Sequence, residues 1–260
     1  MSVIDGVDLN NIPLLRPFHP PPPGVTSNFT SGATQAASIT AATITCLALS
    51  ILFIALRFYI RHATLSWDDY TSLIALILMI PASAAVLMEG KYYNGVHAYD
   101  VRLIDWLPAA TPFSLWAVSA YIFYMAAFGM IKISICLLYL RLFPFTLRKS
   151  RIAVYVIMVV VAGYVIGGEL SIIFSCSPTK KLWEPYVEGI CHFEPFQHSF
   201  VQAVLNLLTD MALLIIPAPM VWKLRLPIGQ RLGIMTAFAL GVLSVNSSIT
   251  TVSAESRVIY

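Results

Sequence analysis

The uncharged stretch LPAATPFSLWAVSAYIFYMAAFGMI, residues 107–131, decides the fold class of this chain. It is longer than the roughly 20 apolar residues that cross a bilayer as one α-helix. Over the whole chain, 58% of the residues are hydrophobic and 11% are charged, whereas soluble domains carry about 25% charged residues. The mean hydropathy is +0.78. This composition predicts an integral membrane protein, and a net charge of +3 is too small to indicate a nucleic-acid partner.

Five further runs are apolar over a similar length, and Asp210 is the one residue with a carboxylate inside them. They cover residues 36–56, 70–88, 152–168, 196–222 and 232–254. A helix is the expected form because it satisfies its backbone polar groups within the segment. The short alternating segments of an outer-membrane barrel are absent from the sequence. We therefore predict an all-α, polytopic bundle of six transmembrane spans over residues 36–256.

Residues 1–35 differ from the rest in containing the proline-rich stretch RPFHPPPPG, residues 16–24. This composition predicts a disordered, solvated tail. No charged n-region followed by an apolar h-region opens the chain, so the first run is expected to serve as its own insertion signal.

The distribution of basic residues predicts that the tail is extracellular, because cytoplasmic loops are enriched in lysine and arginine. The loops after the first, third and fifth runs hold the larger group, which is Arg57, Arg61, Arg141, Arg148, Lys149, Arg151, Lys223, Arg225 and Arg231. The opposite side holds fewer basic residues and most of the acidic ones. Asn28-Phe29-Thr30 is a candidate glycosylation sequon that is usable only outside. We therefore expect a multi-pass protein in the plasma membrane.

Cys176 and Cys191 flank the loop between the fourth and fifth runs, which the charge distribution places outside. Oxidising surroundings favour a disulfide between them, and two free thiols are the alternative. Closing a loop of this size contributes about 3 kcal/mol in the chain-entropy model. Cys46 and Cys136 lie within apolar runs, where a cysteine packs as a small hydrophobic residue.

Three ionisable residues interrupt the apolar runs, namely Lys132, Glu169 and Asp210. An uncompensated charge at the bilayer centre costs about 2.5–3.5 kcal/mol, so such residues usually find a partner inside the bundle. Counted from the inner ends of their helices at 1.5 Å per residue, Lys132 lies about 13 Å deep and Asp210 about 19 Å deep. Glu169 lies nearer the outer face. We therefore predict a Lys132–Asp210 pair with Asn206 as a hydrogen-bonding neighbour.

This intramembrane polar network of Lys132, Asp210, Asn206 and Glu169 has two interpretations. One is a structural clamp between helices. The other is a ligand site, a proton relay or a conformational switch. The residue pattern leaves both open.

Charged residues also mark the predicted inner face. Arg57 and Arg61 end the first run, and Asp68 and Asp69 precede the second, where either aspartate can cap the helix. Arg141 ends the third run as an interfacial anchor or as a switch that faces a cytoplasmic partner.

No catalytic or cofactor motif stands out in the sequence. The five histidines (19, 62, 97, 192 and 198) lack metal-ligand spacing, and no Walker loop occurs. Nothing besides the intramembrane lysine points to a retinal cofactor. We therefore predict no cofactor and no metal, and a non-enzymatic role rather than an enzyme.

The order of several motifs resembles one family, the fungal rhodopsin-like integral membrane proteins, which are related to receptor-like proteins of filamentous fungi. The matching stretches are LRFYIRH, SWDDY, KISICLLYLRLF, FSCSP, LNLLTDMALLIIPAPMVWKLRLP and QRLGIMTAFALGV. The resemblance implies a seven-helix architecture with an outside N-terminus, of which this chain shows six spans and lacks the seventh.

The resemblance also implies a function. A receptor-like membrane protein would sense an extracellular small molecule or surface cue and couple to a cytoplasmic signalling partner. The alternative is a membrane enzyme or transporter of fungal specialised metabolism.

Overall fold

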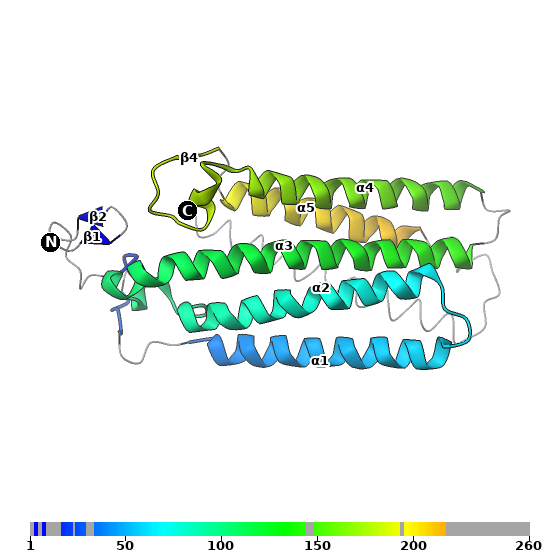
Figure 1. The fold of residues 1–260 in the computed structure, drawn as a ribbon, viewed down its shortest axis with the longest axis horizontal. Coiled ribbons are helices and arrows are strands. Elements are labelled where there is room, and N and C mark those ends of the chain that lie inside the picture. The colour runs from blue at the N-terminus through cyan, green and yellow to red at the C-terminus, as the bar shows by residue number, and fades with distance from the viewer. Residues whose placement is uncertain are drawn as a thin grey trace. The chain divides into compact units, whose positions relative to one another are not determined.

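A computed structural model describes residues 3–4, 7–8, 17–22, 24–29, 34–143, 148–192 and 195–216. Its main elements are five helices: α1 Ala36–Arg61, α2 Trp67–Glu89, α3 Leu103–Leu142, α4 Arg148–Ile173 and α5 Pro195–Ile215 (Figure 1). Three 3₁₀ turns accompany them, η2 Gly90–Tyr92, η3 Ala98–Asp100 and η4 Thr179–Leu182. Four two-residue strands form two antiparallel pairs, β1 Val3–Ile4 with β2 Val7–Asp8 and β3 Cys176–Ser177 with β4 Ile190–Cys191. The chain is therefore all-α, as predicted.

Four helical segments are long and apolar enough to cross a membrane, namely Ala36–Arg61, Trp67–Tyr92, Leu103–Leu142 and Arg148–Ile173. They correspond to the first four predicted runs. The fifth run begins in α5, whose apolar part Val201–Leu213 is shorter than a full span. The rest of the fifth run and all of the sixth, residues 232–254, lie outside the described residues.

Helix α3 extends well beyond the uncharged run that predicted it. Its 40 residues correspond to about 60 Å at 1.5 Å per residue, against a hydrocarbon core of about 30 Å. The helix is therefore about twice as long as one perpendicular crossing of that layer requires.

The described residues divide into two compact units. The first consists of Met1–Phe128 and Ser171–His192, and the second of Gly129–Leu170 and Phe193–Tyr260, so α3 and α4 contribute to both. In the first unit α1 and α2 lie side by side and are joined by a short turn (Figure 1). The buried face of α2 carries small residues, Ser72, Ala75, Ala82, Ser83 and Ala85. Small side chains allow a close approach between membrane helices.

The second unit has its own apolar core, in which Cys136, Phe143, Val154 and Leu213 are buried. Cys136, Val154 and Leu213 come from α3, α4 and α5, and Phe143 directly follows α3. Helices α3 and α4 approach closely at Gly129, because a Cβ added there would lie 2.9 Å from Val165 Cγ2.

The described part of the N-terminal tail makes specific contacts, which its proline-rich composition did not predict. The backbone N–H of Phe18 donates to the carbonyl of Val101 at 2.9 Å, and the ring of Phe18 lies 4.9 Å from that of Trp106. The guanidinium of Arg102 lies over the ring of Phe29. Two aromatic side chains provide the apolar contacts that a run of prolines lacks.

Candidate functional site

The side chain of Lys132 is the centre of a polar cluster between α3 and α5. Its ammonium nitrogen donates to Asn206 Oδ1 at 2.6 Å and to Thr209 Oγ1 at 2.6 Å. It forms an ion pair with Asp210 Oδ1 at 3.0 Å and lies 3.1 Å from the backbone carbonyl of Asn206. Only 2% of the lysine side chain is exposed, against 16% for Asp210. The predicted partners Asn206 and Asp210 both lie at the ammonium group.

The contacts satisfy the hydrogen-bonding capacity of this ammonium group. Lysine has three N–H donors, and four oxygen atoms lie within 3.1 Å of the nitrogen. The hydroxyl of Thr209 donates to a carbonyl of its own helix, Leu205 or Asn206, and therefore presents a lone pair to the lysine. The aromatic ring of Tyr164 adds a cation–π contact at 5.5 Å. The buried charge is thus neutralised and fully coordinated.

Helical periodicity explains why α5 provides three groups to one cation. Asn206, Thr209 and Asp210 are separated by three and four residues, so they lie on one face of the helix. That spacing could have added Thr209 to the predicted network. Tyr164 lies on α4, and no local pattern in the sequence relates it to Lys132.

Two carboxylate oxygens in the second unit are buried without a hydrogen-bond partner in the part of the chain that the structure describes. One is Oδ2 of Asp210, and the other is Oε1 of Glu169. Glu169 was predicted in the same network as Lys132. The four oxygen atoms described above at the ammonium group all belong to α5, whereas Glu169 lies on α4.

A second ionic cluster joins α1 to the start of α2. Arg57 bonds to Asp68 Oδ2 and Asp69 Oδ1, both at 2.7 Å, and Arg61 bonds to the same two oxygens, both at 2.8 Å. The backbone N–H of Ser66 donates to Asp69 Oδ2 at 3.0 Å, which completes a capping box for α2. The sequence contains a signal for this pairing. It has two arginines one helical turn apart, followed after a short turn by two adjacent aspartates. The sequence interpretation placed all four at one face but did not pair them.

Arg141 is exposed in the last turn of α3. A different arginine caps that helix, since Arg151 of α4 donates to the carbonyls of Leu140 at 2.7 Å and Phe143 at 3.0 Å. The interpretation of Arg141 as an interfacial anchor or a partner-facing switch stays a prediction, and the contacts of Arg151 with this helix end were not predicted.

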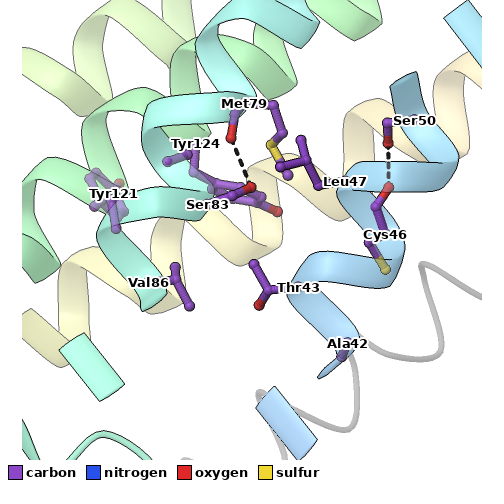
Figure 2. Close-up of a pocket in the computed structure, with 12 residues that line it drawn as sticks. Ala42, Thr43, Cys46, Leu47, Ser50, Met79, Ser83, Val86, Tyr121 and Tyr124 are labelled. Atoms are coloured by element: carbon purple, nitrogen blue, oxygen red, sulfur yellow. Dashed lines mark hydrogen bonds between the residues drawn. The ribbon is translucent and has the colours of Figure 1, made fainter. Parts of the chain in front are cut away.

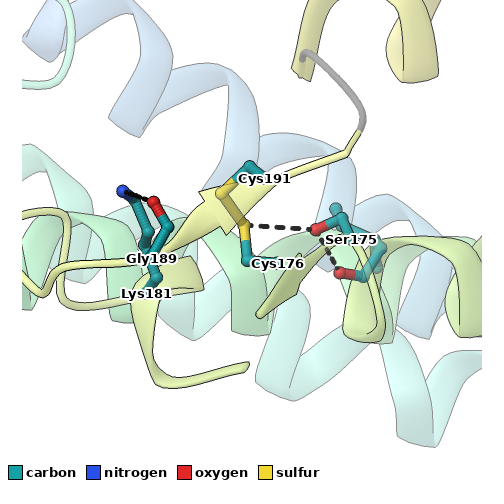
Figure 3. The surroundings of a disulfide bond; sticks show 6 residues. Ser175, Cys176, Lys181, Gly189 and Cys191 are labelled. Atoms are coloured by element: carbon teal, nitrogen blue, oxygen red, sulfur yellow. Dashed lines mark hydrogen bonds between the residues drawn. A yellow bond between two sulfur atoms is a disulfide. The ribbon is translucent and has the colours of Figure 1, made fainter. Parts of the chain in front are cut away.

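The disulfide between Cys176 and Cys191 is present, which confirms that prediction. It joins β3 to β4, and Lys181 Nζ donates to the carbonyl of Gly189 across the same loop at 2.6 Å (Figure 3). The backbone N–H of Asn28, the candidate glycosylation residue, donates to Asp100 Oδ1 at 2.8 Å, and the residue is exposed. Thr30 of the sequon lies outside the described residues.

A cavity of about 430 Å³ lies among α1, α2 and α3 in the first unit. Its lining residues are uncharged, and Figure 2 shows Thr43, Ser83 and Tyr124 around it. This volume is within the range of small-molecule sites, roughly 300–1,000 Å³. Sequence reasoning missed the cavity because its lining is built from scattered small and aromatic residues of three helices. No group of three metal-ligating side chains occurs within the described ranges.

The sequence model of the fungal rhodopsin domain matches residues 39–258 of this chain. The chain belongs to the fungal rhodopsin domain family. This fungal rhodopsin domain protein is 30% identical over 198 residues to "Polyenoic acids biosynthesis gene cluster protein Ba17b" of Metarhizium anisopliae, covering 74% of this chain and 53% of that protein. It is 27% identical over 203 residues to "SAT4 family membrane protein" of Emericella nidulans, covering 76% of this chain and 51% of that protein.

A third relative of this fungal rhodopsin domain protein is "Wortmanamides biosynthesis cluster protein C" of Talaromyces wortmannii, with 26% identity over 74% of this chain and 53% of the relative. The chain thus spans about half the length of these curated relatives. No solved structure matches it.

Proposed function

We propose that this fungal rhodopsin domain protein is a receptor-like protein that binds a small molecule within its transmembrane helices. The observation that carries the proposal is the uncharged, partly open cavity among α1, α2 and α3, which is lined by side chains of three membrane-length helices. A site of this kind suits recognition because binding between helices can change how they pack.

The proposed orientation has the N-terminus outside, in the plasma membrane. Its support is the excess of lysine and arginine on the opposite side and the disulfide in the loop after α4. Arg148 and Lys149 are exposed at the start of α4, as is Arg141 at the end of α3. These residues are the proposed contact for a cytoplasmic signalling partner.

The alternative is a membrane enzyme or transporter of fungal specialised metabolism. Two of the relatives are named as proteins of biosynthetic gene clusters. The Lys132–Asp210 pair, with Asp210 Oδ2 lacking a hydrogen-bond partner among the described residues, is the local feature that such an activity would use.

A deletion strain tests the two proposals against each other. The strain and a complemented control are exposed to an organic extract of their own culture medium, and the transcriptional response and the metabolite profile are both measured. A receptor predicts that the response is lost while the intermediates of each pathway keep their proportions. A changed metabolite profile with an intact response would contradict the receptor proposal and favour the alternative.

Orientation is tested separately with an Asn28→Gln variant. If the tail is outside and the sequon is used, digestion with an N-glycosidase lowers the apparent mass of the native protein and leaves that of the variant unchanged. An epitope tag at the N-terminus of the protein provides the independent control, because an antibody should label it on intact cells. Labelling only after the cells are permeabilised would contradict the orientation.

A further inference from the structure

The cavity in the first unit has a lining whose chemistry restricts its ligand. None of its lining residues carries a charge, and they come from α1, α2 and α3. A charged group that entered would lose part of its hydration without gaining a counter-ion from the lining, which is unfavourable. The ligand class is therefore uncharged.

Three hydroxyl groups of the lining are oriented as hydrogen-bond acceptors. Thr43 donates to the carbonyl of Ile39, Ser50 to that of Cys46, and Ser83 to that of Met79, each at 2.8 Å. Figure 2 shows the bonds of Ser50 and Ser83 directed back along their own helices. A hydroxyl has one hydrogen and two lone pairs. Because each hydrogen is already used within the helix, these side chains offer lone pairs to a bound molecule.

The surroundings of the cavity indicate how a ligand arrives. Helix α1 contains no buried residue within the described structure, and two of its residues that line the cavity, Ala42 and Cys46, are exposed. In a candidate membrane span, exposed side chains face lipid. An apolar molecule dissolved in the bilayer can therefore reach the cavity from the side of α1.

We propose that this cavity binds an uncharged, lipophilic small molecule that carries a hydroxyl or amide N–H donor and enters from the bilayer. The inference rests on the proposed function and specifies the ligand class of the same site. The donor bonds to one of the acceptor hydroxyls of Thr43, Ser50 and Ser83, and the apolar body contacts residues such as Leu47 and Val86.

The test uses the full chain in phosphatidylcholine vesicles and a photoreactive probe, dodecan-1-ol with a diazirine in its chain. Crosslinked residues are mapped by mass spectrometry. Dodecan-1-ol and tridecane, which have equal numbers of heavy atoms, then compete at equal mole fractions in the membrane. Dodecylammonium and dodecanoate provide charged competitors.

We expect the probe to label peptides of α1, α2 and α3 that line the cavity. Dodecan-1-ol should compete about fivefold better than tridecane, since one hydrogen bond contributes about 1 kcal/mol. The combined variant Thr43→Val, Ser50→Ala, Ser83→Ala should abolish this difference. Its matched control is Ser72→Ala with Ser119→Ala, because these serines make the same kind of bond to their own helices outside the cavity.

A second variant keeps the test independent of the hydroxyl substitutions. Ala42→Phe fills the mouth of the cavity and should reduce labelling of the lining at least threefold, whereas Ala41→Phe, at a neighbouring exposed position, should not. The disulfide and the thermal unfolding temperature confirm that each variant is folded.

The possible outcomes separate this inference from the proposed function. Equal competition by tridecane, or stronger competition by either charged compound, overturns the ligand class while a small-molecule site remains. Labelling no higher in the lining than on the lipid-facing surface of α4 overturns the cavity as a site. The receptor proposal then stands or fails on the response of the deletion strain.

Discussion

The two ionic clusters of this protein use the same kinds of groups in opposite ways. In the first unit two arginines share two aspartates that lie 7 to 12 residues away, at a helix–helix turn. In the second unit a single lysine reaches partners 74 and 77 residues away, in the middle of an apolar helix. The arginines remain partly exposed, at 28% and 23%, whereas the lysine is 2% exposed.

This difference teaches what each cluster can contribute. If a carboxylate of the first cluster is removed, its arginines can interact with water or lipid headgroups instead. The main contribution of the first cluster is therefore to fix the turn between α1 and α2. The buried ammonium group of the second cluster cannot replace a lost partner by solvent in this way, and an unpaired charge inside the bundle is costly. We therefore expect the second cluster to decide whether α3 and α5 pack at all, and the predictions below test that ranking.

The largest effect is expected for Lys132→Met. This substitution leaves the carboxylate of Asp210 without its counter-ion, and breaking a buried pair in this way costs about 3–5 kcal/mol. The free energy of unfolding in detergent, measured against denaturant, gives the value. A loss below about 1 kcal/mol would show that the pair does not hold the helices together.

The double swap Lys132→Asp with Asp210→Lys distinguishes a clamp from a working site. A clamp predicts that the swap recovers a large part of the lost unfolding free energy and of the signalling response together. Recovered stability with no response would instead assign the pair a role in ligand binding or proton transfer.

A smaller effect is expected for Asp69→Ala. This carboxylate is fully buried, binds both arginines and caps α2, so its removal should cost about 2–3 kcal/mol from the pair and the cap together. Asp68→Ala is the matched control, because it removes contacts to the same two arginines and leaves the capping box. The comparison between the clusters fails if Asp69→Ala destabilises the protein more than Lys132→Met.

A still smaller effect is expected for Thr209→Val, which removes one acceptor from Lys132 and keeps the shape of the side chain. The loss should be about 1–2 kcal/mol, since a hydrogen bond to a charged group is stronger than a neutral one. Thr71→Val is the control, because its hydroxyl bonds only to carbonyls of its own helix. Equal losses for the two variants would mean that Thr209 does not contribute to the cluster.

The smallest effect is expected for Lys180→Ala. Its pair with Glu184 is largely exposed, with 60% of the lysine side chain accessible, and exposed pairs contribute about 0–1 kcal/mol. The unfolding free energy should change by less than about 0.5 kcal/mol. A larger change would indicate that the loop closed by the disulfide depends on this pair.

Several features of this protein could be predicted from local sequence. The first four apolar runs form helices of membrane length. They could be predicted because the length of an apolar helix depends on consecutive residues of the sequence. Cys176 and Cys191 pair as expected, since a short loop brings them together. Depth along two helices was enough to propose Lys132 with Asp210. Each of these inferences depends on counting along the chain.

Other features could not be predicted, because they depend on how helices are rotated about their axes. The contact of Tyr164 with Lys132 and the hydrogen bonds from Arg151 to the end of α3 both follow from helix rotation. Apolar runs without a strong polar face give little information on rotation.

By itself, then, the sequence determined the all-α membrane class, the approximate positions of the first four apolar helices and the disulfide, because hydrophobic length and short loops are encoded locally. Only the tertiary structure decided which three α5 side chains coordinate Lys132, which arginines share Asp68 and Asp69, and that a cavity lies among α1, α2 and α3. Each of these features lies at a contact between different helices. Which helix faces are in contact depends on tertiary packing and not on the order of residues within one helix.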